Sequence, residues 1–301
     1  MAGNIVNELP FIKMHGAGND YVFIDGFETR LPDNPSELSV AISHRGFGVG
    51  SDGLVLLIPP TDDSSDVEMR MWNADGSEGS MCGNAARCVA LWMNVNRRLG
   101  DTCRVRTVSR MVNVTAVDSG RDRLRDRLHG RFRVDHGSPR FDVDCDERTE
   151  LLADVCVPEL SQLDQLKFVA LSMGNPHAVF VVDQLTDLLV RQVGAIVERH
   201  VRFKDGTNVE WVRVLSRREI ELRVWERGSG ETLACGSGAC AAVAACVLQG
   251  RCDRNVDILV DMPGGQLSVC WADSGELLLT GPAEVSFQGV WRGRASVSLK
   301  M

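Results

Sequence analysis

Hydrophobic and polar residues alternate in many short segments of this chain. Residues 67–73 (VEMRMWN) and 220–226 (IELRVWE) alternate apolar and polar positions, which is typical of strands that bury one face. Residues 21–25 (YVFID) and 177–183 (HAVFVVD) are short apolar runs rich in β-branched and aromatic residues, and they also predict strands. Runs of strands dominate the pattern, which favours an α+β protein over a doubly wound α/β protein.

Two segments have the composition of helices. Residues 83–99 are rich in helix-forming residues, and residues 236–248 are almost wholly apolar. A helix that is apolar on all sides is buried, because no polar face remains for solvent. Cys82 and Cys235 stand immediately before these two segments. We therefore expect two central helices, each with a thiol at its N-terminus.

These patterns occur twice in the same order. Residues 18–19 match residues 174–175, and His44 matches His200, both at an offset of 156 residues. Residues 67–73 match residues 220–226, and Cys82 matches Cys235, both at an offset of 153 residues. Self-similarity in one order at nearly one offset indicates a duplicated unit of about 150 residues.

The repeat predicts two pseudo-symmetric domains, each a curved, mostly antiparallel sheet wrapped round a central helix. We place the N-terminal half-domain at residues 1–135 plus a C-terminal strand at 286–301, and the C-terminal half-domain at 136–285. Residues 118–150 are rich in Arg and Asp and mark the join. We interpret this stretch as a solvated hairpin and linker, in preference to an arm that binds nucleic acid.

Charge and composition limit the classes of partner. Lys and Arg total 33 and Asp and Glu total 41, so the net charge is −8 at pH 7, which argues against a general nucleic-acid binder. The longest near-helical apolar run, residues 239–248, is far shorter than the roughly 20 residues of a membrane span. The N-terminus lacks the features of a signal peptide. We expect a cytoplasmic protein that binds neither membranes nor nucleic acid.

Ten cysteines in 301 residues are too sparse for a disulfide scaffold. Neither C-x-x-C nor H-E-x-x-H occurs, so we expect no metal site. Cys82 and Cys235 stand out because both lie in Gly-rich turns before apolar helices, at matched positions of the repeat. We interpret the others as small buried hydrophobic residues: Cys88, Cys103, Cys145, Cys156, Cys240, Cys246, Cys252 and Cys270.

A helix N-terminus presents unpaired N–H groups and the positive end of the helix dipole. A carboxylate docks there, and a thiol there has a lowered pKa. If the two halves pack about a pseudo-twofold axis, Cys82 and Cys235 face each other across a cleft. One thiol then removes a proton from a substrate carbon and the other returns a proton to the opposite face, which inverts the stereocentre. Such chemistry requires no cofactor.

Longer motifs are distributed over both halves of the chain: KMHGAGNDYVFID (13–25), NADGSEGSMCGNAARC (73–88), MGNPHAVF (173–180), DGTNV (205–209) and WERGSGETLACGSGACA (225–241). Together they resemble the diaminopimelate epimerase family. The resemblance implies a cofactor-independent, two-thiol epimerase that interconverts LL- and meso-diaminopimelate on the bacterial route to lysine and the cell wall. The expected partner is a small amino-acid substrate; a homodimer is compatible with the sequence, which does not fix the oligomeric state.

The resemblance also implies roles for single residues. Cys82 and Cys235 would be the acid/base thiols, assisted in proton exchange by His177 and Glu226. Gly83, Asn84, Gly236 and Ser237 would hold the reacting carboxylate, Asn19 and Glu226 the reacting ammonium, and Asn73, Asn175, Asn208 and Arg227 the distal end of the substrate. Two interpretations without a catalytic role stay open. His177 is a core histidine with satisfied polar atoms, or Glu226 caps a helix or pairs with an Arg.

The chain departs from the family pattern at a few positions. Ala85 follows Asn84 where many members have Gly, which a helix tolerates if φ is negative. Gly53 stands where some members have Gln, so a contact to the substrate edge is absent or supplied by water. Val201 and Lys204 stand where Pro is frequent, which bears on loop rigidity.

Other functions compete with this one. A racemase of another amino acid on the same scaffold is the nearest, but proline-type relatives carry His after Cys-Gly, where this chain has Asn84. A nucleotide-binding oxidoreductase is suggested by residues 236–241 (GSGACA), which fit G-x-G-x-x-A, although no clear buried strand leads into them. A redox sensor or metabolite-binding protein is the third, since it would use the same two thiols.

Overall fold

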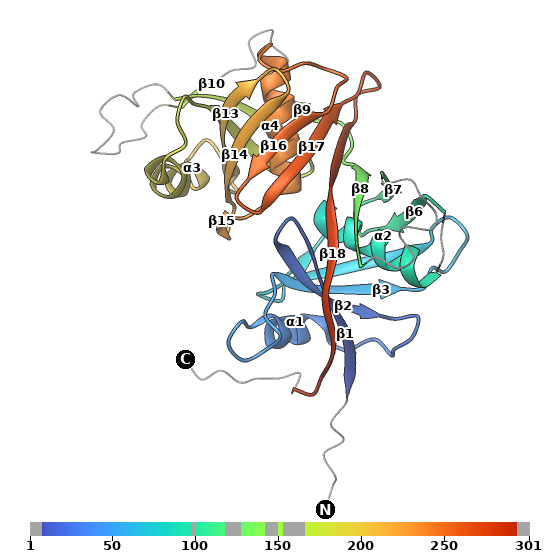
Figure 1. Cartoon of the computed structure of the whole chain (residues 1–301). Coiled ribbons are helices and arrows are strands. Elements are labelled where there is room, and N and C mark those ends of the chain that lie inside the picture. Colours follow the sequence, from blue (N-terminus) through green and yellow to red (C-terminus); the bar gives the residue numbers. More distant parts are fainter. Residues whose placement is uncertain (1–7, 98–99, 118–127, 142–149, 153–165, 294–301) are drawn as a thin grey trace, which may run out of the picture. The chain divides into compact units, whose positions relative to one another are not determined.

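The chain folds into two compact units. A computed structural model describes residues 8–97, 100–117, 128–141, 150–152 and 166–293 (Figure 1). Unit 1 comprises residues 1–134 and 281–301, and unit 2 comprises residues 135–280. The chain passes from one unit to the other after residues 134 and 280. The sequence-based boundaries fall one and five residues later (135 against 134, 285 against 280).

The strands of unit 1 form a closed ring. They pair in the order β18–β1–β2–β3–β4–β6–β7–β8, and β8 pairs with β18 again. The pairs β2–β3 and β4–β6 are parallel. The bounds are β1 (Leu9–Gly16), β2 (Asn19–Asp25), α1 (Pro35–Ser43), β3 (Gly53–Ile58), β4 (Val67–Asn73), β5 (Glu78–Gly79), α2 (Gly83–Arg97), β6 (Thr102–Arg106), β7 (Met111–Ala116), β8 (His129–Asp135) and β18 (Leu277–Trp291).

Unit 2 repeats this arrangement. β9 and β10 pair with β11, and the order continues β11–β12–β13–β14–β16–β17–β18, with β12–β13 and β14–β16 parallel. The start of β18 also bonds to residues 136 and 137. The bounds are β9 (Arg140–Phe141), β10 (Glu150–Leu152), β11 (Leu166–Ser172), β12 (Pro176–Val181), a π-helix (Leu188–Val193), α3 (Gly194–Glu198), β13 (Asn208–Ser216), β14 (Glu219–Glu226), β15 (Gly230–Thr232), α4 (Gly236–Leu248), β16 (Ile258–Met262) and β17 (Gly265–Trp271).

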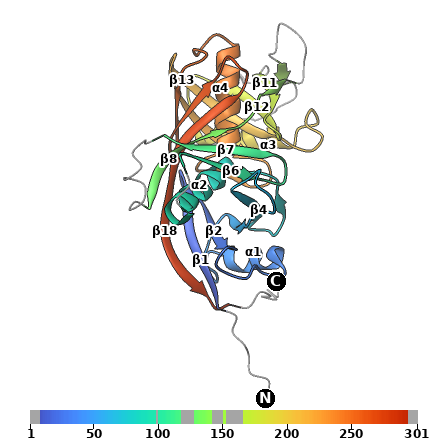
Figure 2. The same cartoon turned by 90° about the vertical axis from the view of Figure 1, so that its right-hand side faces the viewer.

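Each unit encloses one helix. α2 packs against β1, β6 and β7, and α4 packs against β11 to β14 and β17 (Figures 1 and 2). All residues from 239 to 246 of α4 are buried, and most are Ala, so the surrounding strands approach this helix closely. α2 differs in one respect, because it contains the fully buried Arg87. The Arg87 guanidinium donates to the Asn84 side chain at 2.8 Å and to the Pro282 carbonyl at 3.0 Å.

The expected fold class is confirmed: the protein is α+β, with two similar halves that each wrap a curved, mostly antiparallel sheet round one helix. The strand at 67–73 and the helix at 236–248 have the predicted bounds. The strand expected at 286–301 begins earlier, because β18 (Leu277–Trp291) pairs with β17 before it pairs with β1. Part of the expected solvated hairpin and linker (118–150) is described and is wrong there, because β8 (His129–Asp135) pairs with β7 and β18 and buries Phe132 and Val134 in the core. Residues 118–127, 142–149 and 294–301 lie outside the described residues.

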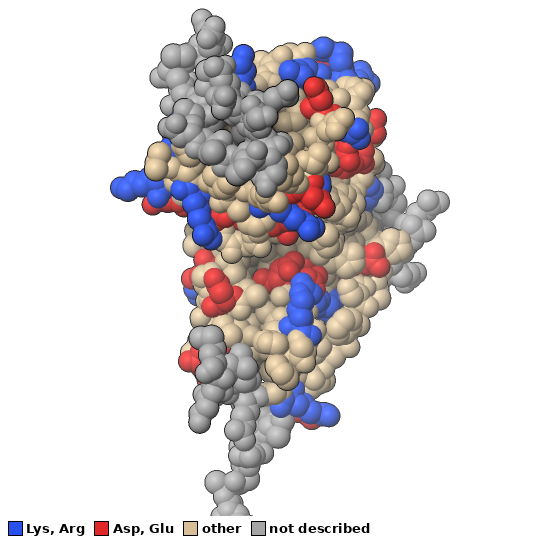
Figure 3. All heavy atoms as spheres, turned by 90° about the vertical axis from the view of Figure 1, so that its left-hand side faces the viewer, with Lys and Arg blue, Asp and Glu red and all other residues tan. Residues whose placement is uncertain are grey.

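Charged side chains of both signs lie next to one another on the face drawn in Figure 3. Exposed ion pairs of the protein include Arg213 of β13 with Glu221 of β14, and Arg106 of β6 with Asp62 of the loop between β3 and β4. In the described part of the chain, no helix is both long and apolar enough to cross a membrane. Within the same residues, no group of three or more His, Cys, Asp or Glu side chains is arranged to hold a metal ion.

Two departures from the family pattern have a structural explanation. Ala85 lies in α2 and is fully buried, and its φ is not among the positive values of the described residues, so a helix accommodates it as expected. Gly53 begins β3 where a Cβ atom would lie 2.1 Å from the Trp72 carbonyl oxygen of β4. A Gln side chain has no place on this backbone, and Gly53 is therefore a requirement of the strand pairing.

Gly53→Ala is expected to destabilise the protein, because the new methyl group pushes β3 away from β4. We expect the free energy of unfolding to fall by about 1–3 kcal/mol in urea denaturation. Gly100→Ala is the matched control, since a Cβ at Gly100 meets no atom within 4 Å, and it should change stability by less than about 0.5 kcal/mol. Equal stability of the two variants would contradict this explanation of Gly53.

Candidate functional site

Cys82 precedes helix α2 in unit 1, and its sulfur caps the helix. The backbone N–H groups of Asn84 and Ala85 donate to the sulfur, and the Tyr21 hydroxyl donates to it at 3.7 Å. Burial raises the pKa of the Cys82 thiol, and the N–H groups, the Tyr21 hydroxyl and the positive charge of Arg87 counteract part of this rise. Hydrogen-bond donors and a cation therefore lie on one side of the Cys82 sulfur.

A tight turn brings Asn19 to Cys82. Ala17 and Gly18 join β1 to β2, and both have positive φ, 56° and 81°, as in the two-residue hairpin turns that match strand twist. The backbone of Ala17 is strained, because this region favours glycine. Asn19 is the first residue of β2, and its Oδ1 accepts from the Cys82 thiol at 3.5 Å.

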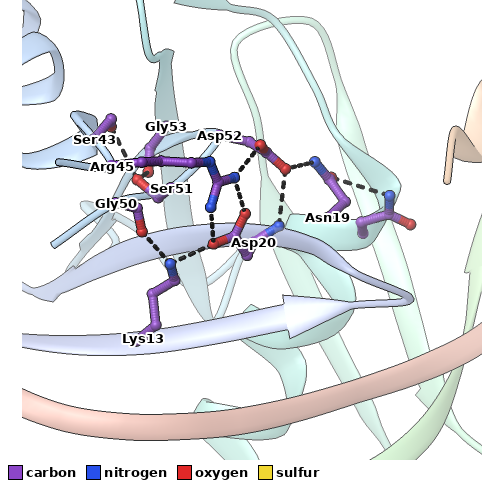
Figure 4. A network of polar contacts seen from close by, with 10 residues as sticks. Lys13, Asn19, Asp20, Ser43, Arg45, Gly50, Ser51, Asp52 and Gly53 are labelled. Atoms are coloured by element: carbon purple, nitrogen blue, oxygen red, sulfur yellow. Dashed lines mark hydrogen bonds and ion pairs between the residues drawn. The ribbon is translucent and has the colours of Figure 1, made fainter. Parts of the chain in front are cut away.

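The Asn19 amide is fixed in one orientation (Figure 4). Its Oδ1 also accepts from Asn84 Nδ2 at 3.0 Å, and its Nδ2 donates to the Asp52 carboxylate at 2.7 Å. The same Asp52 oxygen accepts from the Asp20 backbone N–H at 3.0 Å, and as an acceptor it holds the amide nitrogen on its own side. The amide oxygen of Asn19 must therefore face Cys82.

Two cations hold the carboxylates behind this amide (Figure 4). Arg45 Nη2 donates to Asp20 at 2.7 Å and to Asp52 at 2.8 Å, and Lys13 contacts Asp20. Burial raises the pKa of Asp20, but hydrogen bonds from Arg45 and Lys13 outweigh it and leave the pKa below its usual range. The Asp20 carboxylate is therefore ionised at neutral pH, and with Arg45 it forms a rigid support for the loop that carries Asp52.

The remaining predicted residues of unit 1 lie at two places. Gly83 is the first residue of α2, and Asn84, the second, is buried. Asn73 ends β4, where its Nδ2 donates to Ser77 Oγ at 3.0 Å in the following turn. The structure thus brings Asn19, Gly83 and Asn84 to Cys82, whereas Asn73 belongs to the turn after β4.

Cys235 caps helix α4 in unit 2 in the same way. Its backbone is extended (φ −125°, ψ 113°), and its sulfur accepts from the Gly238 N–H at 3.4 Å and contacts Ser237 Oγ at 3.6 Å. The residue is 6% exposed. Burial raises the pKa of this thiol well above its usual range, and the carboxylates of Glu226 and Glu210 raise it further.

A chain of hydrogen bonds runs from the start of α4 to a buried carboxyl group. Asn175 Nδ2 donates to Ser237 Oγ at 3.4 Å, and His177 Nε2 donates to Asn175 Oδ1 at 2.9 Å. On its other side, His177 Nδ1 lies 2.7 Å from Glu210 Oε1, and both of these side chains are 0% exposed. Both ring nitrogens thus have partners, as the core-histidine reading requires, and the contacts from His177 toward Cys235 run through Asn175 and Ser237.

Glu210 and Tyr21 are the residues of these two groups that the sequence analysis missed. Glu210 follows Asn208 by two residues in β13, and Tyr21 follows Asn19 by two residues in β2. Residues two apart on a strand share a face. The sequence could therefore have indicated that the residues two positions after Asn19 and Asn208 point to the same side as these two amides. The parallel pairing of β12 with β13, which sets His177 opposite Asn208, is not visible in the sequence.

The end of β14 collects the other predicted residues of unit 2. Glu226 accepts from the Thr232 hydroxyl at 2.5 Å and is close enough to raise the pKa of Cys235. The Arg227 N–H donates to Asn208 Oδ1 at 2.8 Å, and its guanidinium donates to the Asp205 carbonyl at 3.2 Å. Unit 2 therefore presents a carboxylate, an amide and a guanidinium beside one another.

The other described cysteines behave as core residues. Cys88, Cys103, Cys240, Cys246 and Cys252 are buried, Cys270 is partly buried, and all are free thiols. Burial raises the pKa of Cys88 and Cys103 to about 12, so both stay protonated at neutral pH. Cys145 and Cys156 lie outside the described residues.

Comparison with known proteins gives one consistent family. The family described as "Diaminopimelate epimerase" matches residues 11–140 and 169–286. Proteins of this name are 40% identical over 291 residues in a Geobacillus strain and 38% identical over 295 residues in Bacillus subtilis, each covering 95% of this chain and 99% of the relative. A solved hydroxyproline epimerase from Agrobacterium vitis has a TM-score of 0.67 at 13% identity, covering 94% of this chain and 92% of its own, which shows a shared fold.

Gly238 allows the Glu210 carboxyl group to lie beside the Cys235 sulfur. A Cβ at Gly238 would lie 3.0 Å from Glu210 Oε1 and 3.3 Å from Cys235 Sγ, whereas the nearest atoms to a Cβ at Gly236 are 3.6 Å away. We expect Gly238→Ala to be less stable than Gly236→Ala by about 1–3 kcal/mol, because the extra methyl is overpacked. Urea denaturation measures the difference, and identical unfolding midpoints would show that Glu210 is free to move aside.

Proposed function

Because the chain belongs to the diaminopimelate epimerase family, we propose that it interconverts LL- and meso-2,6-diaminopimelate with Cys82 and Cys235 as acid and base. The observation that carries the proposal is that each sulfur caps a buried helix. Helix N–H groups stabilise negative charge, on a thiolate as on a bound carboxylate. Both sulfurs are thus held where a proton can leave or arrive.

Epimerisation requires one proton transfer on each face of the substrate α-carbon. One sulfur, as thiolate, takes the α-hydrogen as a proton, and the electron pair of the broken C–H bond delocalises into the substrate carboxylate. The other sulfur donates its S–H proton to the opposite face of the same carbon and becomes the thiolate. The two thiols then exchange protons with solvent to restore the starting state. The reaction needs no electron acceptor and no cofactor.

The helix N-termini are the proposed sites for the reacting carboxylate. The N–H groups of Gly83 and Asn84 at α2 and of Gly236 and Ser237 at α4 stabilise the enolate charge as it develops. Asn19 and Glu226 supply acceptors for the reacting ammonium group. The proposed contacts to the distal end are Asn73, Asn175, Asn208 and Arg227, in which amides pair without adding charge and the guanidinium grips a carboxylate.

His177 and Glu226 are proposed to assist the Cys235 half of the reaction. Glu226 acts through its negative charge, which favours the protonated thiol. His177 acts through the hydrogen-bond chain that ends at Ser237. The cytoplasmic location is a prediction from the sequence, with which a homodimer is compatible.

Competing functions fit the site less well. A dinucleotide fingerprint needs a parallel strand that runs into the glycine turn, but β15 before Cys235 is short and pairs antiparallel with β14. A single-headed amino acid leaves Arg227 without a carboxylate to bind. The likeness to the hydroxyproline epimerase concerns the fold alone.

Cys82→Ser and Cys235→Ser are each expected to reduce epimerisation of LL-diaminopimelate at least about 100-fold, because serine is a much weaker acid and base. The fold should survive, since serine is a good helix cap. The measurement is inversion together with deuterium incorporation in heavy water. Cys270→Ser is the control and should remain active; near-normal inversion in either of the other variants would refute the two-thiol proposal.

Arg227→Gln tests the substrate class. Loss of the guanidinium should raise KM for diaminopimelate by about tenfold or more, with a smaller change in kcat, because the lost contact binds the distal carboxylate. Arg213→Gln is the control, because Arg213 lies on β13 and forms an exposed ion pair with Glu221. Steady-state kinetics should also show no turnover of proline or other single-headed amino acids; efficient turnover of one of them would favour the alternative racemase.

A further inference from the structure

A buried carboxyl group that the proposed reaction does not use lies at the end of α3. Glu198 is the last residue of this helix, and it is 7% exposed. Both of its oxygens accept hydrogen bonds, Oε2 from the Trp225 indole Nε1 at 2.7 Å and Oε1 from the Gly228 backbone N–H at 2.9 Å. These two donors stand on either side of Glu226 and Arg227 in the chain. One side chain therefore holds the backbone before and after two residues of the site.

We infer that Glu198 is a positioning residue for substrate binding, which holds the turn at residues 226–229 so that the Arg227 guanidinium lies where a distal carboxylate binds. The inference rests on the proposed function, in which Arg227 makes that contact, and it adds the residue that fixes the contact in place. Glu198 acts through the backbone of the turn and takes no part in proton transfer.

The backbone of the turn is held at two successive N–H groups. The Arg227 N–H donates to Asn208 Oδ1 at 2.8 Å, and the next N–H, that of Gly228, donates to Glu198. Gly228 has a φ of 77°, in the left-handed region that favours glycine, so the chain turns sharply just after Arg227. Because side-chain acceptors bind two adjacent peptide groups, the backbone at Arg227 is fixed in one orientation.

A glycine gives the Arg227 side chain its path. A Cβ at Gly206 would lie 3.2 Å from Arg227 Cγ and 3.1 Å from its Cδ, and 3.2 Å from the Glu198 carbonyl oxygen. That carbonyl oxygen accepts from the Thr207 N–H at 3.2 Å, and the Arg227 guanidinium donates to the Asp205 carbonyl at 3.2 Å. Glu198 thus holds the loop along which the guanidinium lies as well as the turn from which it leaves.

The Trp225 indole is packed so that it directs its N–H steadily at Glu198. Gly194 begins α3, and a Cβ there would lie 3.0 Å from Trp225 Cβ and 3.2 Å from its Cγ. The helix therefore approaches the end of β14 as closely as a glycine permits. The ring also packs against the hydrophobic core of unit 2. A carboxyl group on α3 thus receives its bond from a side chain that has little room to move.

Glu198→Gln tests the inference with almost no change of shape. Glutamine has one acceptor oxygen and its nitrogen only donates, so it can accept from the Trp225 indole or from the Gly228 N–H but not from both. We expect KM for LL-diaminopimelate to rise about tenfold, with kcat changed less than about threefold, because the distal contact is weakened and both thiols stay in place. An unchanged KM would overturn the inference.

Combination with Arg227→Gln separates positioning of the guanidinium from any other effect. If Glu198 acts through Arg227, Glu198→Gln should raise KM less than about twofold once Arg227 is already glutamine. A further tenfold rise, to about 100 times the wild-type KM in the double variant, would show that the two residues act independently, against the inference.

Asp253→Asn is the matched control for lost stability. Asp253 accepts from Arg217 Nε at 2.6 Å, and it follows the C-terminal end of α4, whereas Cys235 caps the opposite end. Its loss removes a comparable bond of unit 2 and should leave KM within about twofold of the wild-type value. An equal rise of KM in Asp253→Asn and Glu198→Gln would assign the effect to general destabilisation and overturn the inference.

A two-dimensional N–H correlation spectrum of labelled protein examines the turn without substrate. The chain has six tryptophans, and Trp225→Phe identifies the Trp225 indole signal by its absence. In Glu198→Gln, either this signal or the Gly228 amide signal should move, because glutamine keeps only one of the two bonds. Asp253→Asn should move neither. If both signals keep their positions in Glu198→Gln, Glu198 does not hold the turn and the inference is wrong.

The spectra and the kinetics together separate this inference from the function itself. If wild-type protein lacks epimerase activity while the signals move as expected, the proposed function fails and the holding of the turn by Glu198 stands. If the protein is active and Glu198→Gln has the wild-type KM, the positioning role alone fails.

Discussion

A sulfur atom at the N-terminus of an enclosed helix is the constraint on which both halves of this protein depend. The first N–H groups of a helix have no partner within the helix, and unsatisfied buried donors are costly. Cys82 and Cys235 supply the missing acceptors. The same hydrogen bonds therefore satisfy the start of the helix and fix the position of the thiol. The reactive group is held as rigidly as the core.

The sheet brings polar residues to each sulfur by strand register. On β2, Asn19 and Tyr21 share a face and both reach Cys82. On β13, Asn208 and Glu210 share a face, and the parallel partner β12 places His177 beside them. A shift of one residue in either strand would turn these side chains to the other face. Register thus determines the chemistry of each half as directly as the identity of the residues.

The two halves share an architecture but not an electrostatic environment. Both have a pair of parallel strand contacts at matching places, a short strand before the cysteine, and an enclosed helix after it. In unit 1 the Tyr21 hydroxyl, the Asn19 amide oxygen and the charge of the buried Arg87 act on the sulfur. In unit 2 two carboxyl groups act on it. A duplicated scaffold with unlike surroundings suits a reaction in which one thiol accepts a proton and the other supplies it.

The sequence by itself determined the alternating strands, the apolar helix at 236–248, the order of repeated blocks and the two cysteines, because each of these depends on residues close together in the chain. It also identified the family through motifs that are local in sequence. Tertiary structure decided the closure of β8 on β18, the exclusion of any side chain at Gly53 by Trp72, the burial of Arg87, and the roles open to Tyr21 and Glu210. These features depend on contacts between residues that are distant in the chain, and hydrophobic periodicity says which face of a strand is buried but not which atoms it will meet there.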